Sequence, residues 1–172
     1  MAEILKLLIP ALLVLLTAYL LLDRLLKNEE KRRNFELFKS NYSVITPIRL
    51  RAYERLMLVL ERTIPNNLIL STIKPGMTNL ELQSQLLNTI RHEFAHNLSQ
   101  QIYVSDELWN YISSAQESLL RLINMCASQC NPNEPASLLA EKILEIYAAS
   151  EETPTEQAIR KLKEEVRKYF PS

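Results

Sequence analysis

Residues 46–64 read Thr-Pro-Ile-Arg-Leu-Arg-Ala-Tyr-Glu-Arg-Leu-Met-Leu-Val-Leu-Glu-Arg-Thr-Ile, and this stretch decides the fold. Thr46 before Pro47 is typical of an N-cap followed by the first helical residue, and Pro65 ends the helix after Ile64. At about 100° per residue, its apolar side chains cover more than half of the helix circumference. So wide an apolar face predicts the central helix of a helical domain.

Similar signals on the C-terminal side predict further helices. Thr78 with Glu81, and Thr153 with Glu156, have the spacing of a capping box, and Ser105 is a good N-cap residue. Together they predict an all-α bundle of about five helices, at 46–64, 78–98, from 105 to a break at 131–135, 135–149 and from 153 onward. A short apolar piece at 68–73 is expected to pack across the bundle, and 100–104 is read as a link or a short strand.

On the N-terminal side, residues 7–22 contain no charged side chain. As a helix, this run would be about 24 Å long, and neighbouring leucines extend it toward the roughly 30 Å of a hydrocarbon core. We therefore predict a transmembrane anchor at 1–26, a juxtamembrane helix or linker at 27–45 and a helical domain at 46–172. A cleaved signal peptide is disfavoured because no small residues mark a cleavage site after the apolar run.

The charges around this segment predict its orientation. Six cations lie between Arg24 and Lys39, whereas only Lys6 precedes the run. The positive-inside rule then predicts a single-pass protein of the cell inner membrane. Its N-terminus would lie outside and its helical domain in the cytoplasm, with the lipid bilayer as one partner.

Composition excludes several functional classes. The net charge is zero, so no nucleic-acid partner is expected. The chain contains a single glycine, whereas phosphate-binding loops and dinucleotide fingerprints need several. Kinase, Walker-type and Rossmann chemistry are therefore not expected.

One motif points to catalysis, the sequence His92-Glu93-Phe94-Ala95-His96. Two histidines four residues apart share a helix face and can bind zinc, and the glutamate between them can act as a base toward metal-bound water. The motif resembles the signature of zincin metallopeptidases. That resemblance implies an alternative function, a membrane-tethered zinc metallopeptidase with His92 and His96 as metal ligands and Glu93 as the catalytic residue.

Three observations argue against this alternative. A catalytic zinc needs a third protein ligand, but the chain has no third histidine, and the extended metzincin positions hold Ser99 and Ile102. A glutamate such as Glu117 or Glu141 stays open as a ligand. His92 and His96 also lie opposite the apolar face of their helix, and peptidases of this kind present substrate along a sheet edge, whereas this chain offers little strand. We therefore expect exposed histidines, with no metal, cofactor or catalytic residue.

The two cysteines offer a related hypothesis. Cys126 and Cys130 could join the two histidines in a four-ligand zinc site, but they lie on the apolar stripe of their helix. Buried free thiols fit this placement better.

Residues 49–56 and 93–105, together with the apolar segment before them, resemble an uncharacterised family of bacterial single-span membrane-anchored helical proteins. The resemblance implies an anchor plus a helical domain of unknown function, and it supplies no catalytic residues. The sequence thus favours a membrane-anchored helical interaction or scaffolding protein that is not an enzyme. Its protein partner is unknown, and self-association is left open.

Overall fold

The structure is a computed structural model that describes the backbone of residues 2–170. It describes the side chains of residues 15–17, 19, 21–33, 35–36 and 43–170. The chain divides into two compact units, Met1–Pro47 and Ile48–Ser172. The predicted domain limits at 26 and 45 stay a prediction.

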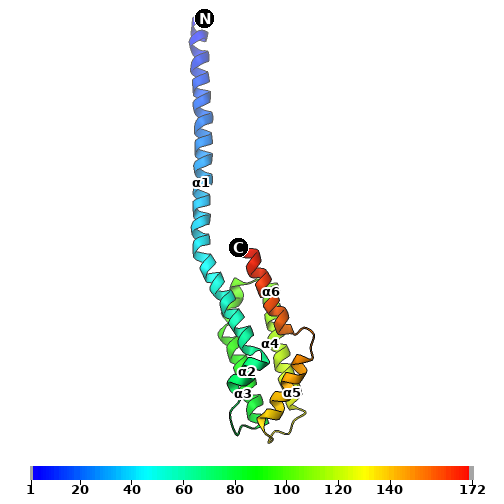
Figure 1. The fold of residues 1–172 in the computed structure, drawn as a ribbon. Helices are drawn as coiled ribbons and strands as arrows, with labels where there is room; N and C mark the ends of the chain where they lie inside the picture. The colour runs from blue at the N-terminus through cyan, green and yellow to red at the C-terminus, as the bar shows by residue number, and fades with distance from the viewer. Residues whose placement is uncertain (1, 171–172) are drawn as a thin grey trace. The chain divides into compact units, whose positions relative to one another are not determined.

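Every regular element of the described residues is helical (Figure 1). In chain order the elements are α1 (Ala2–Thr63), α2 (Pro65–Thr72), α3 (Asn79–His96), the 3-10 helix η1 (Leu98–Tyr103), α4 (Asp106–Ala127), α5 (Ala136–Ala148) and α6 (Pro154–Tyr169). The one β-type pairing among these residues is an isolated bridge between Thr78 and Pro135. The helical architecture thus agrees with the prediction.

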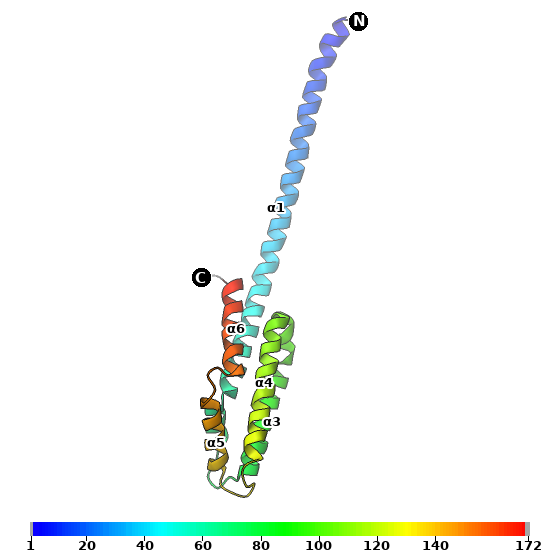
Figure 2. The same cartoon turned by 90° about the vertical axis from the view of Figure 1, so that its right-hand side faces the viewer.

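The second unit is a helical bundle with one apolar core. Helix α4 packs against α3 and α6, and α5 packs against α3 and α4, while the short α2 covers α3 and α5 (Figures 1 and 2). The apolar stripe of α4 is buried in full: Leu108, Ile112, Ala115, Leu119, Ile123 and Cys126. From the last turns of α1, the core receives Ala52, Tyr53, Leu56, Val59 and Leu60.

The predicted helix starts are confirmed where side chains cap them. Both capping boxes form, because Thr78 and Thr153 each accept from the backbone of the glutamate three residues on, and Glu81 and Glu156 each accept in return. Ser105 caps α4 by accepting from the backbone N–H of Leu108. These helix boundaries therefore follow from local sequence alone.

Helix α5 starts by a different device. Its N-cap residue is Pro135, which offers no side-chain hydrogen bond. Instead, the buried Asn79 at the start of α3 accepts from the backbone N–H of Leu139 at 3.2 Å. The same side chain donates to the carbonyl of Asn131 at 2.8 Å. One amide thus joins the start of α3 to the loop before α5 and to the first turn of α5.

The predicted helix start at Thr46 and Pro47 is wrong. Helix α1 runs without interruption from Ala2 to Thr63, so Pro47 lies inside a helix. A proline in a helix interior lacks one backbone N–H donor and is normally excluded. It stands here at the limit between the two compact units, where the second unit begins at Ile48.

Among the described residues, no helix is long and apolar enough to cross a membrane. This finding contradicts the predicted transmembrane anchor at 1–26 and the single-pass inner-membrane location with a cytoplasmic C-terminal domain. Asp23 and Lys27, which follow the uncharged run, form an ion pair at 2.8 Å. The side chains of residues 1–14 lie outside the described part.

Two short segments are also helical. Residues 68–73 belong mostly to α2, which packs on α3 and α5 with Leu68 and Ile69 buried, as expected of this piece. The segment 100–104 belongs mostly to the 3-10 helix η1, so the short strand considered there does not form. At the start of α3, Leu82 is buried while Leu80 is exposed. The capping box orients the first turn so that Leu82, near Met77, faces the core.

Candidate functional site

Helix α3 presents the His92-Glu93-x-x-His96 motif on its outer side. The two imidazoles are exposed and parallel, with ring centroids 6.2 Å apart and an interplanar angle of 10°. Glu93 is half-buried and lies beside α1, where its Oε1 is 3.8 Å from Nη1 of Arg62. The motif therefore faces the part of α1 that carries Arg62.

A pocket of about 220 Å³ lies between α1 and this part of α3. Two arginines on the same face of α1, Arg55 and Arg62, line the pocket opposite the two histidines. Leu58, Val59, Glu93 and Asn97 complete the lining. Asn97 donates to the carbonyl of Glu93 at 2.9 Å, which fixes the end of α3 at the pocket.

No group of three or more His, Cys, Asp or Glu side chains that could hold a metal ion occurs in the described part of the chain. Of the two glutamates left open as a third ligand, Glu117 instead lies 3.4 Å from Arg121 on the surface of α4. The alternative, zinc binding by His92 and His96 with Glu93 as the base, rests on the motif alone.

The two cysteines do not join the histidines in such a group. Cys126 is buried in the core, and burial, together with the neighbouring Cys130, raises the pKa of its thiol. A thiol held in its protonated form is a poor nucleophile and a poor metal ligand.

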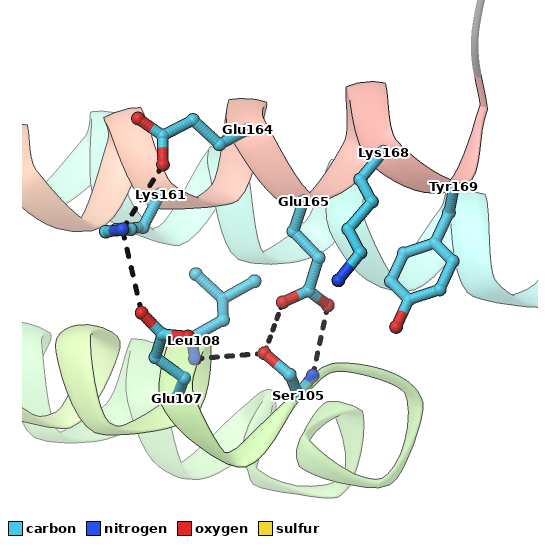
Figure 3. Close-up of a pocket in the computed structure, with 8 residues that line it drawn as sticks. All are labelled: Ser105, Glu107, Leu108, Lys161, Glu164, Glu165, Lys168 and Tyr169. Atoms are coloured by element: carbon cyan, nitrogen blue, oxygen red, sulfur yellow. Dashed lines mark hydrogen bonds and ion pairs between the residues drawn. The ribbon is translucent and has the colours of Figure 1, made fainter.

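A second polar cluster was missed by sequence reasoning, and Glu165 on α6 is its centre. Its carboxylate accepts from the hydroxyl of Tyr53 on α1 at 2.8 Å and from the backbone N–H of Ser105 at 3.0 Å. It also accepts from the Ser105 hydroxyl (Figure 3). One side chain thereby joins α1, the start of α4 and α6.

This arrangement completes a capping box from a distant part of the chain. In an ordinary box the residue three after the N-cap is a glutamate that accepts from the N-cap N–H. After Ser105 that position is Leu108, so α4 has no local acceptor. Glu165 supplies it from α6, and a carboxylate is also favourable at the positive end of the α4 dipole.

Arg49 extends the cluster toward η1. Its Nε donates to the carbonyl of Tyr103 at 3.0 Å and its Nη2 to the hydroxyl of Tyr53 at 3.1 Å. The guanidinium also lies over the ring of Tyr169, 4.3 Å from the centroid. Burial and the hydrogen bond to Glu165 raise the pKa of Tyr53 to about 12, with Arg49 opposing the shift.

We expect the raised pKa of Tyr53 to make the bundle sensitive to alkali. A pKa raised in the folded state favours the neutral phenol, so its stabilisation is complete below the ordinary value of 10.0 and is lost as the pH rises toward about 12. The free energy of unfolding, measured in urea from pH 9 to 12, should therefore fall less steeply in Tyr53→Phe than in the wild type. Parallel curves for the two proteins would contradict this assignment.

Beside Glu165, a pocket of about 200 Å³ separates α6 from the start of α4 (Figure 3). Its charges are largely paired, since Nζ of Lys161 lies 3.6 Å from Glu107 and 3.3 Å from Glu164. These pairs tie the two helices together and leave few free groups for a ligand.

An apolar groove of about 560 Å³ lies between α1 and α6. Its floor and walls are Leu50, Tyr53, Met57, Leu58, Leu162 and Val166, and its rim carries Glu54, Lys163 and Arg167. None of the three rim charges forms an ion pair with another described residue. The groove is thus an unfilled apolar surface with both signs of charge at its edge.

A family model described as "Family of unknown function (DUF7935)" matches residues 1–169. The chain belongs to this family. The match covers both compact units of the DUF7935 protein and includes the His-Glu motif, the Glu165 cluster and the groove. No curated protein and no solved structure matches the chain.

Sequence reasoning on this DUF7935 protein found the motif but neither the cluster nor the groove. Glu165 and Tyr53 come from helices that are far apart in sequence, and no local pattern pairs them. The one available signal was negative: Ser105 is a good N-cap with no acceptor three residues later. Such a start must find its acceptor elsewhere or leave the N-cap N–H to water.

Proposed function

We propose that this protein is an interaction module that works as a dimer, with two copies joined through the apolar groove between α1 and α6. The observation that carries the proposal is the groove itself. It has a volume of about 560 Å³, an apolar lining and charged side chains at its edge among the described residues. Apolar patches rimmed by charge are typical of protein interaction sites.

Two leucine side chains of the groove are left partly exposed to solvent. Leu50 and Leu58 are exposed, at 40% and 52%, although both belong to the helix that supplies much of the core. Burying a fully exposed leucine side chain is worth about 1.5–3 kcal/mol, and covering each of these half-exposed leucines contributes part of that. A helix laid along the groove would cover both leucines together with Met57 and Val166.

The rim selects a second copy of this chain as the occupant. The acid Glu54 lies on the α1 side of the groove, and the bases Lys163 and Arg167 lie on the α6 side. In a twofold dimer the same patch meets itself, so each contact occurs twice. Glu54 of one copy then pairs with Lys163 or Arg167 of the other, and the rim is self-complementary without any other partner.

Charge reversal tests this arrangement. Glu54→Arg and Arg167→Glu should each raise the dimer dissociation constant at least about tenfold, or about 1.4 kcal/mol, because each places like charges together twice. The double variant, which restores opposite charges across the interface, should dimerise nearly as well as the wild type. Sedimentation equilibrium of the full chain measures all four proteins.

A matched pair of leucines tests the apolar part. Leu50→Glu should abolish the dimer, whereas Leu138→Glu, at a similarly exposed position on α5 (44%), should not change it. Leucines of the first unit, such as Leu15 and Leu26, are exposed as well. Association through that unit would be insensitive to all of these changes in the groove.

A carbodiimide cross-link locates the contact directly. Chains grown with normal and with heavy nitrogen are mixed, and an amide between Glu54 and Lys163 that joins one chain of each kind shows an intermolecular contact. A monomeric wild type, a double charge variant without rescue, or a cross-link found only within one chain would each overturn the proposal. Association that depends only on added lipid vesicles would assign the exposed leucines to a different partner and would also overturn it.

A further inference from the structure

We propose that the pocket between α1 and the end of α3 binds the phosphoryl group of a small phosphorylated molecule, with Arg55, Arg62, His92 and His96 as donors. This site shares Leu58 with the groove, but none of its four proposed donors lines the groove. It gives the His-Glu motif a role in which the histidines bind an anion.

The first support is the pair of arginines. Arg55 and Arg62 are seven residues apart, two helical turns, so both point from α1 into the same pocket. Arg55 has neither an ion pair nor a hydrogen bond with any described residue. Arg62 approaches Glu93 at 3.8 Å, which is beyond hydrogen-bond distance. Arg55 is therefore free for a ligand, and Arg62, although ion-paired with Glu93, keeps its N–H donors without a hydrogen bond.

The second support comes from the opposite wall. His92 and His96 are parallel and exposed, and neither imidazole makes a hydrogen bond within the described part of the chain. An imidazole carries at least one N–H donor whether neutral or protonated. Two donors on α3 thus face two forked donors on α1 across a pocket of about 220 Å³.

Glu93 makes the site selective. Its carboxylate lies on the same pocket, so a ligand has to bring enough negative charge and enough acceptors to outweigh it. A phosphoryl group offers three oxygens and close to two negative charges, and arginine binds phosphate through two parallel hydrogen bonds. A halide offers neither the charge nor the geometry. The chemistry therefore favours a phosphoryl oxyanion.

Calorimetric titration of the full chain tests the proposal, with inorganic phosphate and pyrophosphate as probes and chloride at equal ionic strength as the reference. We expect saturable binding of both phosphates at one site per chain. Arg62→Gln and Arg55→Gln should each raise the dissociation constant at least about tenfold, since each removes a charge-assisted pair. His92→Gln with His96→Gln should weaken binding by a smaller factor.

Arg91→Gln is the matched control. Arg91 precedes His92 on α3 and is exposed, yet it does not line the pocket, so its loss removes the same charge at nearly the same place. It should change the dissociation constant less than threefold. Glu93→Gln should tighten phosphate binding, a result that a merely structural glutamate would not give. Equal losses in Arg91→Gln and Arg62→Gln, or equal binding of chloride, would overturn the proposal.

Discussion

Leu86→Ala is expected to lower the free energy of unfolding by about 3 kcal/mol. Leu86 lies in the middle of α3 with none of its surface exposed, and α3 is packed between α2, α4 and α5. Truncating a buried leucine loses its transfer free energy and leaves a cavity, with measured costs of about 2–5 kcal/mol. Urea unfolding followed by circular dichroism at 222 nm gives the value.

The same helix supplies a control. Leu80 belongs to the same helical wheel but is 53% exposed, so Leu80→Ala should change stability by only a few tenths of a kcal/mol. Similar losses for the two substitutions would mean that α3 is turned about its axis relative to the described structure. The pair of variants thus tests which face of α3 meets the core.

Glu165→Ala should cost about 2–4 kcal/mol, the second largest effect. The substitution leaves the hydroxyl of Tyr53 and the backbone N–H of Ser105 without an acceptor. Each unsatisfied buried donor costs about 1–3 kcal/mol, and a hydrogen bond to a charged group is worth more than a neutral one. It also removes a carboxylate from the positive end of α4. Thermal unfolding and urea unfolding should agree on the loss.

Two neighbouring variants separate this effect from a general change of charge. Glu164→Ala removes the same charge from the adjacent position on α6, but Glu164 pairs only with exposed cations. Its cost should stay within about 1 kcal/mol. Glu165→Gln keeps an oxygen acceptor and should fall between the two. A Glu165→Ala variant as stable as Glu164→Ala would show that the cluster does not hold α6 to α4.

The candidate site was only partly predictable. The His92-Glu93-x-x-His96 spacing is visible in the sequence, and the helical wheel correctly placed both histidines on the exposed side of their helix. The partners across the pocket were not visible. Arg55 and Arg62 lie on the polar side of the central helix, and a helical wheel shows which residues share a face but not which helix lies beside that face.

The N-terminal segment shows the opposite error. An uncharged run was interpreted by its length and flanking cations as a membrane span, and no described helix meets that requirement. Hydropathy measures the preference of a segment for apolar surroundings, but it does not distinguish a lipid bilayer from the apolar surface of a protein. In the first unit, leucines such as Leu15 and Leu26 are exposed.

The sequence by itself determined the helix starts with local caps and the buried stripe of α4, because capping bonds and 3.6-residue periodicity act within one or two turns. Only the tertiary structure decided which groups accept from the remaining backbone N–H groups at the starts of α4 and α5. Asn79 caps α5 and Glu165 completes the cap of Ser105, each from another helix. The groove likewise exists only because α1 and α6 lie side by side. Such contacts join residues 60 to 112 positions apart, and no local pattern encodes that separation.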